Sequence, residues 1–193
     1  MLVYVLTDQQ MKNSNGLQWD LGEPKEIAGG GPLCLYGWLN AYESPLLAVL
    51  HNPIYENIQN PRLFVAETLD GKIIRNGQMK LGSSKMVLIR EMDVPKVTVT
   101  QRVAYGILCA MESDGGEEFM SWATRWLAGE DRSRSAAAVA AWEAKEELAQ
   151  AARAAEEAAK SQEAQAAAAA AWAAEGVGPE VDLVLIAERA MEY

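Results

Sequence analysis

One stretch of the chain brings together residue types that can carry acid–base and nucleophilic chemistry. His51 is the single histidine of the 193 residues, and it follows shortly after Tyr36, Tyr42, Glu43 and Ser44. An imidazole can act as a general base toward a hydroxyl group, and a nearby carboxylate can orient it. A lone histidine at the end of a predicted helix is, however, more typical of a helix terminus, where the helix dipole favours it. We therefore assign no catalytic residue and keep four weak functional candidates, Tyr36, Trp38, Tyr42 and His51.

The other candidate patterns do not match known chemistry. The glycine triplet at 29–31 and the segment LGSSK at 81–85 lack the spacing and the Lys-Ser/Thr pair of a phosphate-binding loop. Cys34 and Cys109 are far apart and in no CxxC context, and with one histidine they cannot complete a tetrahedral zinc site without carboxylates. The carboxylate pairs at 117–118 and 156–157 fall on helix faces that we expect to be solvated. We expect no cofactor and no metal ion.

The charge of the chain restricts its partners. The formal net charge is −10, with 11 Lys and Arg against 15 Asp and Glu in residues 1–130, and 6 against 12 in residues 131–193. An acidic chain without basic clusters is not expected to bind nucleic acid through phosphate neutralisation. No uncharged apolar stretch is long enough for a membrane span, and the first residues do not resemble a signal peptide. We therefore expect a cytoplasmic protein with reduced cysteines and protein partners.

The first part of the chain, residues 1–130, predicts an α+β head domain with a small, mostly antiparallel sheet. Residues 2–7 and 86–91 read as strands, and residues 62–68 and 73–74 read as a hairpin closed by Asp70-Gly71. Ser44-Pro45 is typical of a helix start, and Pro53 should end that helix. Apolar spacing then predicts two packed helices, at 101–111 with Thr100 as N-cap and at 117–127. We interpret Trp122 and Trp126, one helical turn apart, as core anchors of the head.

An alanine-rich segment follows the expected head. Between residues 136 and 174, 22 of the 39 residues are alanine, and no glycine or proline interrupts residues 133–175. High helix propensity throughout predicts one long helix over residues 131–176, with a length of about 60 Å at 1.5 Å per residue. Residues 177–193 then predict a short amphipathic C-terminal helix that starts at Pro179.

The spacing within the alanine-rich segment suggests a coiled-coil partner. Alternating steps of four and three residues form a heptad seam of Ala137, Ala141, Ala144, Leu148, Ala151, Ala155, Ala158, Ala169 and Trp172. Such a seam favours a homo-oligomer or docking on another helix. The alternative is a solitary helix, held by propensity and by pairs such as Glu156 with Lys160, because alanine buries little apolar area.

Several strings of the sequence resemble one uncharacterised family of bacterial and bacteriophage proteins. They are GPLCLYGWLNAYESPLLAVLHNPIYENIQNPRLFVAET, LIREMDVPKVTVTQRVAYGILCAMES and WATRWLAGEDRS, followed by the Ala/Trp-rich tail, and the resemblance covers roughly residues 19–174. It implies a compact α+β head, an alanine-rich helical tail and a phage or prophage setting, but no reaction. Members of the family often have histidine where this chain has Asn40, so an activity that needed that histidine would be lost here.

These observations favour a non-enzymatic phage or prophage protein for protein interaction or assembly, which oligomerises or docks through its alanine-rich helix. We expect it in the cytoplasm of a bacterial or infected host cell, or in the virion. The alternative is an acidic, phage-encoded inhibitor of a host defence complex of the CRISPR or restriction type, which would bind a basic surface. A lesser alternative is an ADP-ribosyltransferase-like enzyme, because the segment GWLNAYESPLLAVL is weakly similar to a motif region of those enzymes. A flat calorimetric titration with NAD would exclude that enzyme.

Overall fold

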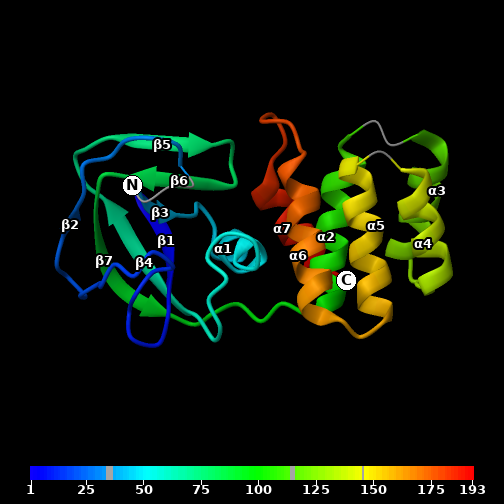
Figure 1. The fold of residues 1–193 in the computed structure, drawn as a ribbon, viewed down its shortest axis with the longest axis horizontal. Helices are drawn as coiled ribbons and strands as arrows, with labels where there is room; N and C mark the ends of the chain where they lie inside the picture. Colours follow the sequence, from blue (N-terminus) through cyan, green and yellow to red (C-terminus); the bar gives the residue numbers. More distant parts are fainter. Residues whose placement is uncertain (34–36, 114–115, 145) are drawn as a thin grey trace. The chain divides into compact units, whose positions relative to one another are not determined.

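The chain is an α+β protein, which confirms the predicted class. The computed structural model describes residues 1–33, 37–113, 116–144 and 146–193. In these ranges it has seven helices and two small antiparallel sheets (Figure 1). The chain forms two compact units, Met1–Lys96 and Val97–Tyr193. The boundary that we expected near residue 130 therefore falls inside the second unit.

The first unit contains both sheets. The four-stranded sheet has the order β1-β4-β7-β2, with β1 at Leu2–Thr7, β4 at Arg62–Thr68, β7 at Lys85–Met92 and β2 at Lys25–Glu26. The three-stranded sheet has the order β3-β6-β5, with β3 at Leu39–Ala41, β6 at Lys80–Ser83 and β5 at Ile73–Asn76. Strands β1 and β7 agree with the strands predicted at 2–7 and 86–91.

The predicted hairpin between residues 62–68 and 73–74 is wrong. Strand β4 pairs with β1 and β7, whereas β5 pairs with β6, so the two segments belong to different sheets. The segment between β4 and β5 is instead hydrogen-bonded to the residues that join β6 to β7. Ser84 N donates to Lys72 O, and Leu69 N donates to Lys85 O. Residues 63–66 of β4 are all buried, and a strand so deeply buried is more stable between two neighbours than at the edge of a local hairpin.

The core of the first unit lies between the two sheets. It contains Trp19 and alternating apolar side chains of both sheets, namely Val3, Val5, Leu39, Ala41, Phe64, Ala66, Leu81, Met86 and Leu88. The backbones of Tyr4 and Tyr42 join the sheets through reciprocal hydrogen bonds of 2.8 and 2.9 Å. Helix α1 (Pro45–His51) begins as predicted, with Ser44 as its N-cap and Pro45 in the first turn.

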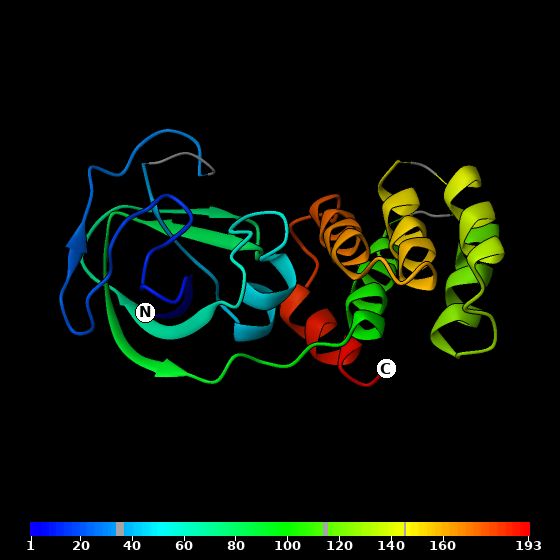
Figure 2. The same ribbon diagram turned by 60° about the horizontal axis from the view of Figure 1, so that its bottom comes forward.

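The second unit consists of helices only among its described residues. Helix α2 (Val99–Met111) contacts α3 (Gly116–Leu127), α5 (Glu146–Ala159), α6 (Glu163–Glu175) and α7 (Leu183–Ala190). Helix α4 (Arg134–Glu143) lies beside α3 and α5 (Figure 2). Two predicted caps are wrong. Thr98, not Thr100, caps α2 in a capping box with Gln101, and α7 begins after Asp182 rather than at Pro179.

The single long helix predicted over residues 131–176 is also wrong, because the segment folds into α4, α5 and α6 (Figure 1). Ala144 ends α4 with an extended ψ of 154°, and Ser161 separates α5 from α6 with a left-handed φ of 59°. The helix propensity of the local sequence favours one helix that continues through both Ala144 and Ser161. Folding back covers alanine faces that a rod would leave in water, and such tertiary burial commonly overrides local propensity.

Candidate functional site

The structure places His51 in the interior of the first unit. Its side chain lies at the last turn of α1, where the residue has no exposed surface, and its ring stacks on Tyr55 with 5.9 Å between the ring centroids. Burial, and secondarily the positive charge of Lys80, lower the pKa of His51 to about 3. The imidazole is therefore neutral at physiological pH and is not exposed to a substrate in solution.

A buried ion pair lies next to this histidine. Lys80 Nζ is 3.9 Å from Glu56 Oε1 and 4.1 Å from the centroid of the Tyr55 ring, and the two charged side chains are 4% and 5% exposed. Ser14 Oγ donates a hydrogen bond to the other carboxylate oxygen of Glu56. The charges thus compensate each other in a desolvated site and attach strand β6 to the segment after α1. Sequence reasoning missed this cluster because its members are far apart in the chain.

The other described residues of the predicted constellation, and Trp38, make contacts away from His51. Glu43 forms an ion pair with Arg75 at 3.1 Å, and Ser44 Oγ accepts the backbone N–H of Leu46 as the helix cap. The indole N–H of Trp38 donates to Gly31 O at 2.9 Å. Tyr42 is buried and makes the backbone link to β1 described above, and Tyr36 lies outside the described residues. Glu43 and Ser44 thus make contacts that do not involve the imidazole, and the described members of the predicted constellation form no open catalytic site.

Trp122 and Trp126 are buried, but they lie in the helical unit rather than in a sheet-containing head. Each is 3% exposed, and Trp122 packs against Phe119 with 5.5 Å between the ring centroids. Arg132 lies over the Trp126 ring at 4.6 Å and also donates to Trp126 O. These contacts anchor α3 and fix the turn that leads into α4.

The residues of the expected heptad seam are distributed over three helices. Ala137, Leu148, Ala151 and Ala155 are buried, Ala141, Ala144, Ala158 and Ala169 are half-buried, and Trp172 is 50% exposed. Helix α5 contacts α4, α6 and α2, and α6 also contacts α2, all within one chain. Small side chains allow very close approach, because a Cβ placed at Gly106 of α2 would lie 2.9 Å from Ala170 Cα of α6. The chain's own helices therefore cover most of the face that we expected a partner helix to cover.

Helix α4 presents a second, uncovered apolar face. Trp142 is 91% exposed and Val139, one turn earlier, is 56% exposed, whereas Ala137 and Ala140 on the other side are buried. We call Val139 and Trp142 the outward face of α4. The heptad seam predicted from the sequence includes neither of them. The available signal was that they are three residues apart and lie off the seam.

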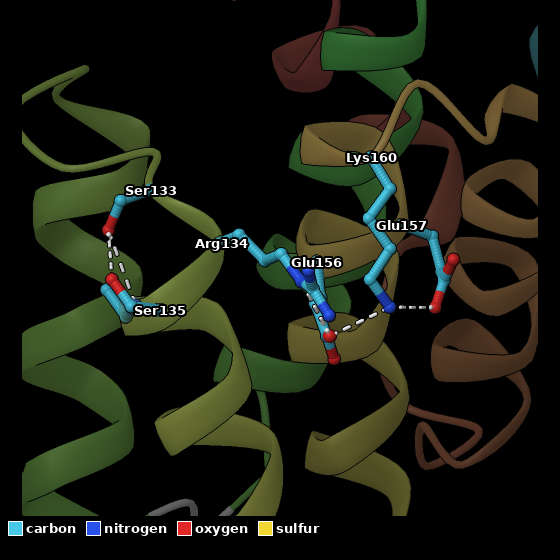
Figure 3. Close-up of polar contacts among 7 residues, drawn as sticks. Ser133, Arg134, Ser135, Glu156, Glu157 and Lys160 are labelled. Atoms are coloured by element: carbon cyan, nitrogen blue, oxygen red, sulfur yellow. Dashed lines mark hydrogen bonds and ion pairs between the residues drawn. The ribbon is translucent and has the colours of Figure 1, made fainter.

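Polar contacts fix the orientation of α4 on α5. Arg134 Nε of α4 lies 3.4 Å from Glu156 Oε1 of α5, and Lys160 Nζ lies 2.8 Å from the same oxygen and 3.0 Å from Glu157 Oε1 (Figure 3). A hydrogen bond from Lys160, and a weaker one from Arg134, hold the pKa of Glu156 below its usual value. The Glu156 carboxylate therefore stays charged at neutral pH. The outward face of α4 is therefore carried on a helix that is attached at its first turn.

Within the described ranges, no helix is long and apolar enough to cross a membrane, and no group of three His, Cys, Asp or Glu side chains is placed to hold a metal ion. Comparison with known proteins gives no relative: no protein-family model, no curated protein and no solved structure matches the chain.

Proposed function

We propose that this chain is a non-enzymatic protein-interaction protein, and that it docks on another protein through the outward face of α4. The observation that carries the proposal is the 91% exposure of Trp142 next to the half-exposed Val139. Tryptophan is the side chain with the largest area to bury, and it is enriched among the residues that dominate binding energy at interfaces. A phage or prophage setting, in the host cytoplasm or the virion, is supported by the sequence resemblance.

We assign the proposed docking element to the outward face of α4 rather than to the alanine seam. The seam residues are mostly covered by helices of the same chain, so a partner helix could reach them only if the bundle opened. The outward face needs no such opening. It lies on a short helix that packs on α3 and α5 and is attached to α5 through Arg134, so little conformational freedom is lost when a partner binds.

The experiment compares two tryptophan variants of the full chain. A protein retained on the immobilised chain from a bacterial or phage-infected lysate is purified, and its affinity is measured for wild type, Trp142→Ala and Trp172→Ala. We expect Trp142→Ala to weaken binding by at least about tenfold, and Trp172→Ala, a half-exposed tryptophan on α6, by less than about threefold.

Three results would contradict this proposal. They are equal effects of the two variants, a wild-type affinity for Trp142→Ala, and self-association of the chain in sedimentation velocity that Trp142→Ala abolishes. The last result would make the occupant a second copy. Circular dichroism of both variants checks that each retains the helical content of the wild type.

One observation favours the acidic-inhibitor alternative. Residues 97–193 carry 8 Lys and Arg against 17 Asp and Glu, a net charge of −9, whereas residues 1–96 carry 9 against 10, a net charge of −1. Nearly all of the net charge thus belongs to the helical unit, as expected if this unit binds a basic surface of a defence complex. Binding by such an inhibitor should weaken by at least about tenfold between low and high salt, where ion pairs are screened. Affinity that is insensitive to salt would exclude this alternative.

A further inference from the structure

An open groove lies between α3 and α4, and its volume is about 700 Å³. One wall comes from α3, and the other comes from α4 and the turn before it. The apolar part of the lining includes Phe119, Trp122 and Val139, and the polar part includes Glu117, Glu118, Asp131 and Arg125. A groove with an apolar floor and a charged rim is the usual form of a site for a peptide segment.

The rim of the groove is negative. Glu117 and Glu118, in the first turn of α3, make no ion pair or hydrogen bond through their side chains with any residue in the described ranges. Hydrogen bonds from Ser133, and then the charge of Arg125, hold the pKa of Asp131 below its usual value, so the Asp131 carboxylate is ionised at neutral pH. Among the described residues that line the groove, there are thus three carboxylates and one guanidinium, and the described ranges place no cation against two of these carboxylates.

The floor of the groove contains a polar group without a partner. Trp122 is 3% exposed, and its indole N–H has no acceptor among the residues that the structure describes. A buried donor without an acceptor costs about 1–3 kcal/mol.

The groove is continuous with the outward face of α4. Val139 lines the groove and is also 56% exposed, and Trp142 follows it one turn later on the same helix. A segment that occupies the groove can therefore extend over Trp142 without leaving the protein surface. The two features together make one elongated surface with a negative end and an apolar end.

We propose that this groove takes a basic, partly apolar segment of a partner protein. Its Lys or Arg side chains would pair with Glu117 and Glu118, and an apolar side chain would pack on Phe119 and Val139. This inference rests on the proposed function and adds the chemistry of the partner. A second copy of the chain does not fit this groove, because two helical units that each carry a net charge of −9 repel each other.

The test uses a fluorescein-labelled peptide that combines Arg and Leu residues in a Ser/Gly background, together with its Gln-for-Arg version. Fluorescence anisotropy reports its binding to the full chain at low salt. The key variant is Glu117→Gln/Glu118→Gln. The matched control is Glu188→Gln/Glu192→Gln, which removes the same charge from two exposed carboxylates at the other end of the same unit. We expect the key variant to weaken binding by at least about tenfold and the control by less than about threefold.

The possible results separate the proposals. Preference for the Arg peptide, with loss of binding only in the Glu117/Glu118 variant, supports the groove. Equal weakening in both double variants means general attraction to an acidic surface and overturns the groove, as does the absence of binding or equal binding of the Gln peptide. If the native partner still depends on Trp142 while the peptide ignores Glu117 and Glu118, the proposed function stands and this inference fails.

Discussion

A Cβ atom placed at Gly106 of α2 would lie 2.9 Å from the Cα of Ala170 on α6, so the two helices meet backbone to backbone. The same Cβ would lie 3.1 Å from the Ala170 carbonyl oxygen. At such a crossing a single methyl group cannot be accommodated by the rotation of a side chain. The helices themselves would have to separate, and this gives the first prediction.

Gly106→Ala should lower the free energy of unfolding by about 1–3 kcal/mol, the usual cost of overpacking. Helix propensity alone predicts the opposite, a gain of about 1 kcal/mol. Urea denaturation followed by circular dichroism measures the difference. Gly178→Ala is the control, because a Cβ there meets no atom within 4 Å. A Gly106→Ala variant as stable as the wild type would show that α2 and α6 are not in this contact.

Ser161→Gly should stabilise the protein by about 0.5–1 kcal/mol. Ser161 has a φ of 59°, where a Cβ atom is unfavourable and glycine is not. In one continuous helix the same substitution would destabilise by about 0.5 kcal/mol, because glycine has the lower helix propensity. The sign of the change in melting temperature therefore distinguishes the folded-back bundle from a rod. Ser161→Ala should not stabilise the bundle and serves as the comparison.

Lys80→Met should destabilise the first unit by about 3–5 kcal/mol, because it leaves the carboxylate of Glu56 buried without its counter-charge. The double variant Lys80→Met/Glu56→Leu should recover a large part of this loss, since no unpaired charge remains. Lys85→Met, which breaks the more exposed pair with Glu26, should cost less than about 1 kcal/mol. Denaturant titrations of the four proteins test this order, and equal costs for Lys80→Met and Lys85→Met would contradict it.

The stability of the first unit should fall as the pH drops below the ordinary pKa of histidine. The pKa of His51 is about 3 in the folded chain and 6.5 in the unfolded chain, so between these values the unfolded state binds the extra proton. From pH 7 to pH 5 the expected loss is about 2 kcal/mol.

A His51→Asn variant lacks the titrating imidazole. Its free energy of unfolding should therefore not fall in this way between pH 7 and pH 5, whatever its stability at pH 7. Denaturant titrations at the two pH values measure the slope. A wild type with the same unfolding free energy at both values would mean that His51 is accessible to protons in the folded chain.

The features that followed from the sequence were those specified by neighbouring residues. Ser44-Pro45 defined the start of α1, because the hydroxyl cap and the proline act within one turn. The alternation of β1 defined a strand, and the spacing of Trp122 and Trp126 identified one face of a helix that is indeed buried. Each of these signals is local.

The predictions that were wrong concern features that depend on residues distant from each other in the sequence. Asp70-Gly71 is a good turn signal, but the partners of β4 are β1 and β7. The residues on both sides of Ser161 have the same high helix propensity, and the break depends on α2, which covers the helices that fold back. Val139 and Trp142 are three residues apart and so share one side of a helix, but this spacing does not show which side of the helix the rest of the chain covers. The groove likewise exists only where α3 and α4 come together.

The close crossing of α2 and α6 has an evolutionary consequence. A stretch of sequence in which six consecutive residues, 166–171, are alanine looks free to vary, since one small residue seems as good as another. At the buried positions Ala166, Ala167, Ala170 and Ala171, however, an added carbon would have to displace neighbouring atoms of a close-packed interior. Mutational drift there should be restricted to alanine and residues of similar size, while the half-buried Ala168 and Ala169 tolerate larger ones. The repeated alanines in this part of the chain thus reflect a strong packing constraint on side-chain size.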